Sequence, residues 1–194
     1  MTPYQLTLLA LAAESESAAL ALWWTVEEIG DALFTAALAA ILATFNQRAV
    51  SLAVTAFSAQ ASIATGNPVP VSLPGIPDET DRLAKAASTV LDVARASDVP
   101  DNIIARIGRA EPLNTAARTY SNQLAESPLV EGWVRNMDAD PCQLCQWWWR
   151  EGRIWPKDHP FQTHHGCACV PRPVWARNIQ STMKSRQLER NRTA

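Results

Sequence analysis

Apolar residues recur at steps of three and four along the first third of the chain, which is the spacing of one helix face. The pattern covers residues 4–65, a stretch rich in alanine and leucine, both of which favour helix. Its only glycine is Gly30, and the only nearby proline, Pro3, precedes the stretch. The pattern therefore predicts two helices, separated either near Glu14–Ser17 or at Gly30.

The second of these helices is unusual in its lack of charge. Residues 32–65 contain a single charged side chain, Arg48. A helix at the surface of a soluble protein normally has a charged face, so this one is expected to bury most of its circumference. Because the rest of the chain offers little to cover it, we expect residues 1–65 to be a helical assembly segment that packs on a partner or on sibling copies. The alternative is a compact bundle in which residues 78–137 fold back over it.

A membrane is a less suitable environment for this segment than a protein partner. The most apolar stretch, Ala32–Phe45, has fourteen residues, whereas a membrane-spanning helix needs about 20. The Met1 end has neither a positively charged segment nor a small-residue cleavage site after a short apolar run. We therefore expect no membrane partner and no secretion.

The middle of the chain begins with a proline-rich linker. Residues 66–77 contain four prolines and two glycines, which favours extended backbone and marks a domain boundary. Helical periodicity returns in residues 78–137. There we expect a helix to about Ser97, a short helix from Val99, another from Leu113 or Asn114, and an apolar helical face over residues 129–137.

Residues 138–175 differ from everything before them. Helical periodicity disappears, aromatic residues become frequent, and all four cysteines of the chain fall within 28 positions. We expect a small module of short strands and turns around a metal, followed by a basic polar tail over residues 176–194. The predicted fold class is therefore mainly α, with alanine-rich N-terminal helices, a proline-rich linker, a central helical segment and a small C-terminal zinc-stabilised module.

Charge is distributed unevenly along the chain. The formal net charge is -2, which is unlike the strongly basic composition of a protein that mainly coats nucleic acid. Residues 1–137 hold 14 acidic and 8 basic residues, whereas residues 138–194 hold 5 acidic and 9 basic residues. The basic segment, residues 138–194 with the polar tail at its end, is thus the part of the chain that we expect to contact a polyanion such as DNA.

The cysteines form two pairs with the spacing of a metal site. Cys142 and Cys145 make a C-x2-C pair, in which two thiolates can bind one ion while the backbone turns between them. Cys167 and Cys169 follow after 21 intervening residues. Zinc prefers four ligands in a tetrahedron, and thiolates favour it. With four positions filled the site is closed to substrate, so we expect a structural zinc ion.

Nearby histidines allow more than one set of four metal ligands. His164 and His165 directly precede the second cysteine pair. All four cysteines can hold the ion, or His164 can join the C-x2-C pair and one later cysteine. We expect His159 to be a surface residue in a turn. The aromatic residues of this region are expected to cover the ion and to pack on the helices, with base stacking as the alternative role; they are Trp147, Trp148, Trp149, Trp155, Phe161 and Trp175.

The order of these residues resembles the C-terminal domain of the phage Mu protein F-like (MuF) head morphogenesis family. That family has an Arg-Thr pair on a helix, then a Trp, an Asp four residues before a C-x2-C pair, a Gly and a closing H-x-x-C-x-C. The resemblance covers residues 100–172, with His165-Gly166 and Ala168 as departures from the family pattern. The matching residues are Arg118, Thr119, Trp133, Asp138, Cys142, Cys145, Gly152, His164, Cys167 and Cys169.

The resemblance implies a minor capsid protein of a tailed phage. Such a protein is expected in the host cytoplasm during assembly and then inside the head near the portal vertex, where it assists head assembly, DNA packaging or ejection. Its expected partners are the portal protein and the major capsid protein or sibling copies. Some relatives carry a fused protease or toxin, but this chain is too short for either, so we expect no enzymatic activity.

Two other functions fit the cysteine pattern. One is a zinc-stabilised HNH-type nuclease that uses the pairs Asp158-His159 and His164-His165 for the base and the catalytic metal. The chain has no asparagine between Met137 and Arg177, which counts against such a site. The other is a nucleic-acid-binding zinc protein, and the acidic balance of residues 1–137 counts against it.

Overall fold

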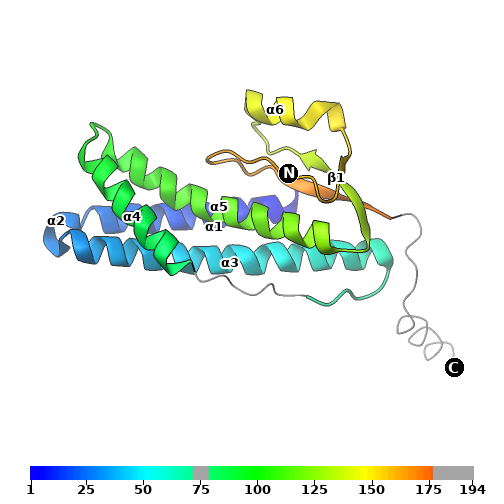
Figure 1. Ribbon diagram of the computed structural model, residues 1–194, viewed down its shortest axis with the longest axis horizontal. Coiled ribbons are helices and arrows are strands. Elements are labelled where there is room, and N and C mark those ends of the chain that lie inside the picture. The colour runs from blue at the N-terminus through cyan, green and yellow to red at the C-terminus, as the bar shows by residue number, and fades with distance from the viewer. Residues whose placement is uncertain (72–78, 177–194) are drawn as a thin grey trace.

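The computed structural model describes residues 1–71 and 79–176 and consists of a helical bundle with a small sheet at one end (Figure 1). The predicted fold class, mainly α with a small C-terminal sheet module, is confirmed. The predicted basic tail lies outside the described residues except for Ala176. The elements are α1 (Pro3–Trp23), α2 (Val26–Ile29), α3 (Asp31–Thr65), α4 (Thr80–Arg95), α5 (Pro100–Glu126), β1 (Val130–Asn136), α6 (Gln143–Trp149), η1 (Arg150–Gly152), β2 (Trp155–Pro156) and β3 (Val170–Trp175).

The N-terminal helices begin and end where local chemistry predicts. Thr2 and Gln5 form a capping box at the start of α1, in which each side chain bonds the other's backbone amide. Gly30, with φ of 78°, separates α2 from α3, so the predicted break at Gly30 is confirmed. The alternative break near Glu14–Ser17 is wrong, because those residues lie inside α1.

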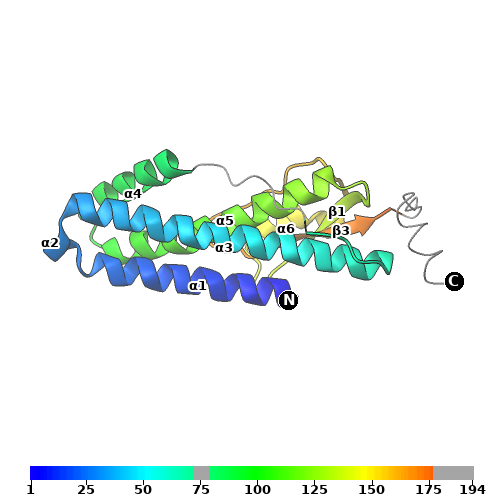
Figure 2. The ribbon, with the colours of Figure 1, turned by 90° about the horizontal axis from the view of Figure 1, so that it is seen from below.

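Helices α1, α3 and α5 run side by side along the long axis, and α4 packs across α3 and α5 (Figures 1 and 2). Helix α3, which includes the weakly charged residues 32–65, is thus packed against α1, α4 and α5 of the same chain. Phe34, Leu38 and Leu42 are fully buried between α3 and its neighbours. The expectation that the rest of the chain offers little cover for this segment is wrong, and the alternative, in which residues 78–137 fold back over it, is what α4 and α5 show.

Helix α5 continues through a proline. Two separate helices were expected on either side of Pro112, but Pro100–Glu126 is one helix with Pro112 inside it. The missing amide of Pro112 costs one helical hydrogen bond, and close packing against α1 offsets that loss. At Gly108, one turn earlier, an added Cβ would lie 3.0 Å from Ala19 Cβ and 3.0 Å from Ser15 O of α1. Tertiary packing thus overrides the local signal for a helix break.

The segment after α5 is a strand, whereas a continuing helical face was expected over residues 129–137. Strand β1 is the central strand of an antiparallel sheet with the order β2-β1-β3. Trp133 pairs with Trp155 on β2 and with Pro173 on β3. The prediction of a helix is wrong here because β1 is buried on both faces. Its sequence therefore lacks the alternation of apolar and polar residues that marks a half-exposed strand. Gly132 has no room for a side chain, because an added Cβ would collide with the carbonyl oxygen of Trp155.

The start of the proline-rich segment packs against the bundle. Val69 lies against the core formed by α1, α3 and α5. Its amide donates a hydrogen bond to Ser62 Oγ (2.8 Å), and Ser58 Oγ donates to its carbonyl oxygen. Residues 72–77 of the predicted linker lie outside the described residues.

Two helices of the bundle resemble membrane spans in composition. By length and apolar character alone, α1 and α3 could each cross a membrane. The core helices of a globular bundle have the same properties, and both helices contribute buried residues to the cores described above.

A partly buried ion network joins α3, α4 and α5. Arg82 of α4 bonds Glu111 of α5 through two nitrogens, at 3.1 and 2.8 Å. Asn46 of α3 donates a third hydrogen bond to Glu111, at 3.2 Å. Burial by itself raises the pKa of Glu111, but the bonds from Arg82 and Asn46 outweigh it, and the net pKa lies below the usual carboxyl value.

Replacing Glu111 with glutamine is expected to destabilise the bundle by about 1–2 kcal/mol at neutral pH. A carboxyl whose folded pKa is lowered contributes stability above its unfolded pKa and loses that contribution as the pH falls through the folded pKa. The difference between Glu111→Gln and the unmodified protein should therefore shrink below about pH 4. Urea denaturation across the acid range measures it, with Glu126→Gln, an exposed change on the same helix, as the control. A stability difference between the two proteins that does not change with pH would contradict the lowered pKa of Glu111.

Candidate metal centre

The first two cysteines lie at the start of a short helix. Cys142 is the N-cap residue of α6, and Cys145 is in its first turn. The Cys142 carbonyl oxygen accepts the amide of Gln146 at 3.1 Å, which closes the turn between the two thiols. This turn directs both sulfur atoms to the same side, as the C-x2-C spacing predicts. Cys145 is 1% exposed, whereas Cys142 lies at the surface.

The other candidate ligands come from the loop that leads into β3. A turn closed by the Cys167 amide and the His164 carbonyl oxygen (3.2 Å) includes Gly166, whose φ is 79°. Ala168, between the two buried cysteines, donates its amide to Asp138 Oδ2 at 3.3 Å. The carbonyl oxygen of Ala168 accepts a hydrogen bond from Gln5 at 3.1 Å. The loop is therefore held both by the end of the β1 segment and by helix α1.

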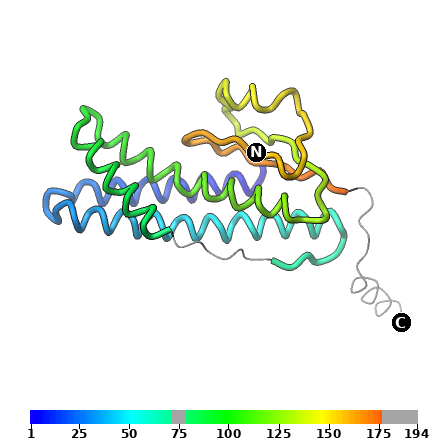
Figure 3. The backbone as a smooth tube through the Cα atoms, in the orientation of Figure 1, coloured from blue at the N-terminus to red at the C-terminus, as the bar shows by residue number. Residues whose placement is uncertain are grey.

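Gln5 is a residue that the sequence analysis missed. It is fully buried, and its amide nitrogen also donates to the carbonyl oxygen of Met137 at 3.1 Å. The N-terminal end of α1 thus lies beside the sheet, as the tube in Figure 3 shows. Sequence separation hid this contact, because Gln5 and Ala168 are 163 positions apart in the chain.

The five candidate ligands form two groups of three that share Cys145. His164 Nε2 lies 3.0 Å from Cys142 Sγ and 3.1 Å from Cys145 Sγ. The sulfur atoms of Cys167 and Cys169 each lie 3.4 Å from Cys145 Sγ. Within each group all ligand atoms are within 4.8 Å of one another. Each group could hold a metal ion, and the sequence analysis had singled out all five residues as candidates.

The electrostatics of the buried sulfur atoms favour a cation. The hydrogen bond from Cys167 lowers the pKa of Cys169 to about 6, while burial raises the pKa of Cys145 to about 12. The pKa of Cys167 is also raised, chiefly by its hydrogen bond to Cys169. One thiolate among these three sulfur atoms thus hinders ionisation of the others. A bound divalent ion removes this repulsion, because it is coordinated by thiolates and not by thiols.

The ligand distances and their surroundings fit a zinc-sized ion. Zinc–sulfur bonds of about 2.3 Å in a tetrahedron place neighbouring sulfur atoms about 3.8 Å apart. The two sulfur–sulfur separations of 3.4 Å are somewhat shorter, so a bound ion requires a small outward movement. His164 Nδ1 lies 3.1 Å from the carbonyl oxygen of His165. A histidine that binds a metal through one nitrogen usually donates from the other in this way.

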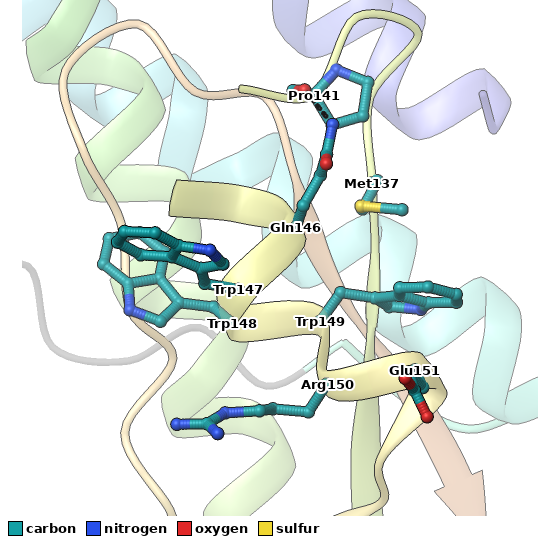
Figure 4. A pocket seen from close by; sticks show the side chains of 8 residues that line it. All are labelled: Met137, Pro141, Gln146, Trp147, Trp148, Trp149, Arg150 and Glu151. Atoms are coloured by element: carbon teal, nitrogen blue, oxygen red, sulfur yellow. Dashed lines mark hydrogen bonds between the residues drawn. The ribbon is translucent and has the colours of Figure 1, made fainter. Parts of the chain in front are cut away.

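The aromatic residues do not all cover this centre. Trp148 lies beside it, with its ring 6.0 Å from the His164 ring, and Phe161 packs against the cysteines. Trp147 and Trp149 are 60% and 36% exposed, so the expectation that they cover the ion is wrong. With Trp148 they line a surface pocket of about 690 Å³ beside α6 (Figure 4).

The remaining aromatic residues support the sheet. Trp155 stacks on Trp133 across the β1–β2 pair, with ring centroids 6.0 Å apart. Trp175 at the end of β3 contacts Phe57 of α3, at 6.1 Å. The Trp175 contact attaches the sheet to the bundle, so the expected packing of Trp175 on a helix is confirmed, whereas the Trp155 contact lies within the sheet. Neither residue is among those that pack against the cysteine cluster.

The histidines of the nuclease alternative are dispersed. The His159 ring stacks on Trp155 at 4.2 Å, so the expected surface residue is in fact half-buried in an aromatic cluster. His165 is exposed and lies near Asn102 and Arg106 of α5. Among the described residues, the two candidate metal groups contain His164 but neither His159 nor His165.

No protein-family model, curated protein or solved structure matches this chain. Function is therefore inferred from the residues themselves and from their arrangement.

Proposed function

We propose that this protein is a minor capsid protein of a tailed phage, related to the MuF head morphogenesis family, with a structural zinc ion in its C-terminal module. The proposed protein assembles in the host cytoplasm and resides inside the head near the portal vertex. Its proposed partners are the portal protein and the major capsid protein or sibling copies. It acts as a structural component and not as an enzyme.

One observation supports the family assignment most directly. Six of the residues that carry the MuF-like pattern, spread between Asp138 and Cys169, meet at the candidate metal centre, whereas Arg118, Thr119, Trp133 and Gly152 lie outside it. Asp138 accepts the amide of Ala168, the residue between the closing cysteines. His164 contacts both members of the C-x2-C pair. A motif whose separated parts form one contacting group is a stronger signal than its spacing alone.

Zinc is the proposed ion because the donor set is sulfur-rich with one imidazole. The ion would be held by Cys142 and Cys145 together with two ligands from the loop of His164, Cys167 and Cys169. Such a site connects α6 to β3, two elements that have few other contacts. A closed site of this type supplies folding energy to a small module and leaves no position for substrate.

The virion assignment can be tested by mass spectrometry of purified phage particles. We expect peptides of this protein in particles purified through a density gradient, in a fixed ratio to the portal protein. Particles from which the DNA has been released should retain it if it is a structural component. Absence from intact particles, with portal and capsid peptides present, would contradict the proposal.

A further inference from the structure

A buried arginine near the candidate metal centre lacks a counter-charge. Arg135, in the central strand β1, is 2% exposed. Its guanidinium carbon lies 4.1 Å from the centre of the Phe161 ring and 5.2 Å from the centre of the Trp148 ring. Nη2 donates to the carbonyl oxygen of Gln162, while Nε and Nη1 have no partner among the described residues.

This burial is energetically unfavourable unless an anion lies nearby. An arginine side chain remains protonated in proteins, and an isolated buried charge costs several kcal/mol. Among the described residues, Arg135 forms no ion pair. Asp138, the acidic residue nearest along the chain, accepts the amide of Ala168 through Oδ2, and its Oδ1 is buried without a partner and forms no ion pair with Arg135. Aromatic rings compensate part of the charge of Arg135, but they leave Nε and Nη1 without a hydrogen-bond acceptor.

The surroundings of Arg135 connect it to the cysteine cluster. Trp148, one of the two rings near the guanidinium, lies against the His164 ring. Phe161, the other ring, packs against Cys145, Cys167 and Cys169. The arginine is thus separated from the candidate ligands by one layer of aromatic side chains. Across such an apolar layer, charges interact more strongly than they do in water.

We propose that Arg135 is the buried counter-charge of an anionic metal–thiolate centre, in which the ion has at least three cysteine ligands. This inference rests on the metal site proposed above. A divalent ion with two thiolates and two neutral ligands has no net charge, and each further thiolate adds one negative charge. A centre with three or four thiolates has the negative charge that compensates Arg135. The proposal therefore requires that the C-x-C pair contributes to binding, and it does not hold for an open site of Cys142, Cys145, His164 and water.

The test compares zinc affinities of full-length variants by competition with a chromophoric chelator. Arg135→Gln removes the charge, Arg135→Lys retains it, and Arg172→Gln is the matched control, because Arg172 is exposed on the neighbouring strand β3. We expect Arg135→Gln to bind Zn²⁺ at least tenfold more weakly than the unmodified protein. Arg135→Lys and Arg172→Gln are expected to bind within about threefold of it.

Cobalt substitution provides an independent measurement. The near-ultraviolet thiolate-to-cobalt absorption increases with the number of cysteine ligands, and we expect the intensity of three or four thiolates in the unmodified protein. An intensity typical of two thiolates would overturn the inference. So would equal zinc affinities of Arg135→Gln and the unmodified protein.

Two further outcomes are also decisive. If Arg135→Gln does not fold even with excess zinc, Arg135→Lys decides: tight binding supports the role of charge, and loss of binding by a folded Arg135→Lys overturns it. An unmodified protein that binds no metal would instead contradict the proposed metal site itself.

Discussion

Replacing Cys145 with serine is expected to abolish metal binding and to unfold the C-terminal sheet. Cys145 Sγ is the one atom common to both candidate ligand groups, so its loss leaves neither group complete. Structural zinc sites contribute about 10–16 kcal/mol of apparent binding free energy in small peptides. The module between Asp138 and Trp175 is too small to replace that contribution with a core of its own.

Metal analysis and hydrogen exchange measure the two parts of this prediction. We expect about one zinc ion per unmodified chain and none in Cys145→Ser. Amides of β1 and β3 should lose protection, while the far-ultraviolet signal of α1, α3 and α5 is retained. Gln143→Ser is the matched control, because Gln143 lies in the same turn of α6 and is exposed. Unchanged protection of the sheet in a metal-free Cys145→Ser protein would show that the ion does not hold the fold.

Replacing Tyr120 with alanine is expected to have the largest effect on the helical bundle. Tyr120, in α5, is 1% exposed and stacks on Tyr4 of α1 with ring centroids 5.3 Å apart. The Phe57 ring of α3 meets it edge to face at 5.8 Å. One side chain therefore connects the three long helices at the end of the bundle that carries the sheet.

Truncation of this ring should lower the free energy of unfolding by about 3–5 kcal/mol, the usual cost of an aromatic-to-alanine change in a core. For a domain of this size the melting temperature would fall by roughly 10 °C. Tyr120→Phe retains the ring and should cost less than about 1.5 kcal/mol. Thermal and urea denaturation of the two variants provide the comparison. Equal destabilisation by both would mean that the hydroxyl, and not the ring, carries the interaction.

Local chemistry in the sequence determined the starts of α1 and α3 and the composition of the candidate site. Thr2 and Gln5 define the start of α1, and Gly30 defines the start of α3, because caps and glycines act within a few residues. The cysteine spacing singled out four of the five candidate ligands for a similar reason: a C-x2-C or C-x-C pair is a local chelate. His164 was named because it directly precedes the second pair. These features depend little on how the rest of the chain folds.

Tertiary structure decided every feature that depends on contacts between distant residues. Helix α5 continues through Pro112 because α1 packs closely against Gly108, and β1 is a strand because β2 and β3 pair with it.

Contacts between distant residues also decided which side chains of the candidate site are buried and which are exposed. Burial of Arg135 and Gln5, and exposure of Trp147, depend on which elements pack around α6 and the cysteine loop. Propensity and periodicity describe neighbours along the chain, whereas burial depends on neighbours in space. Only the packed bundle brings Gln5 to Ala168 and places Arg135 one aromatic layer from the thiols.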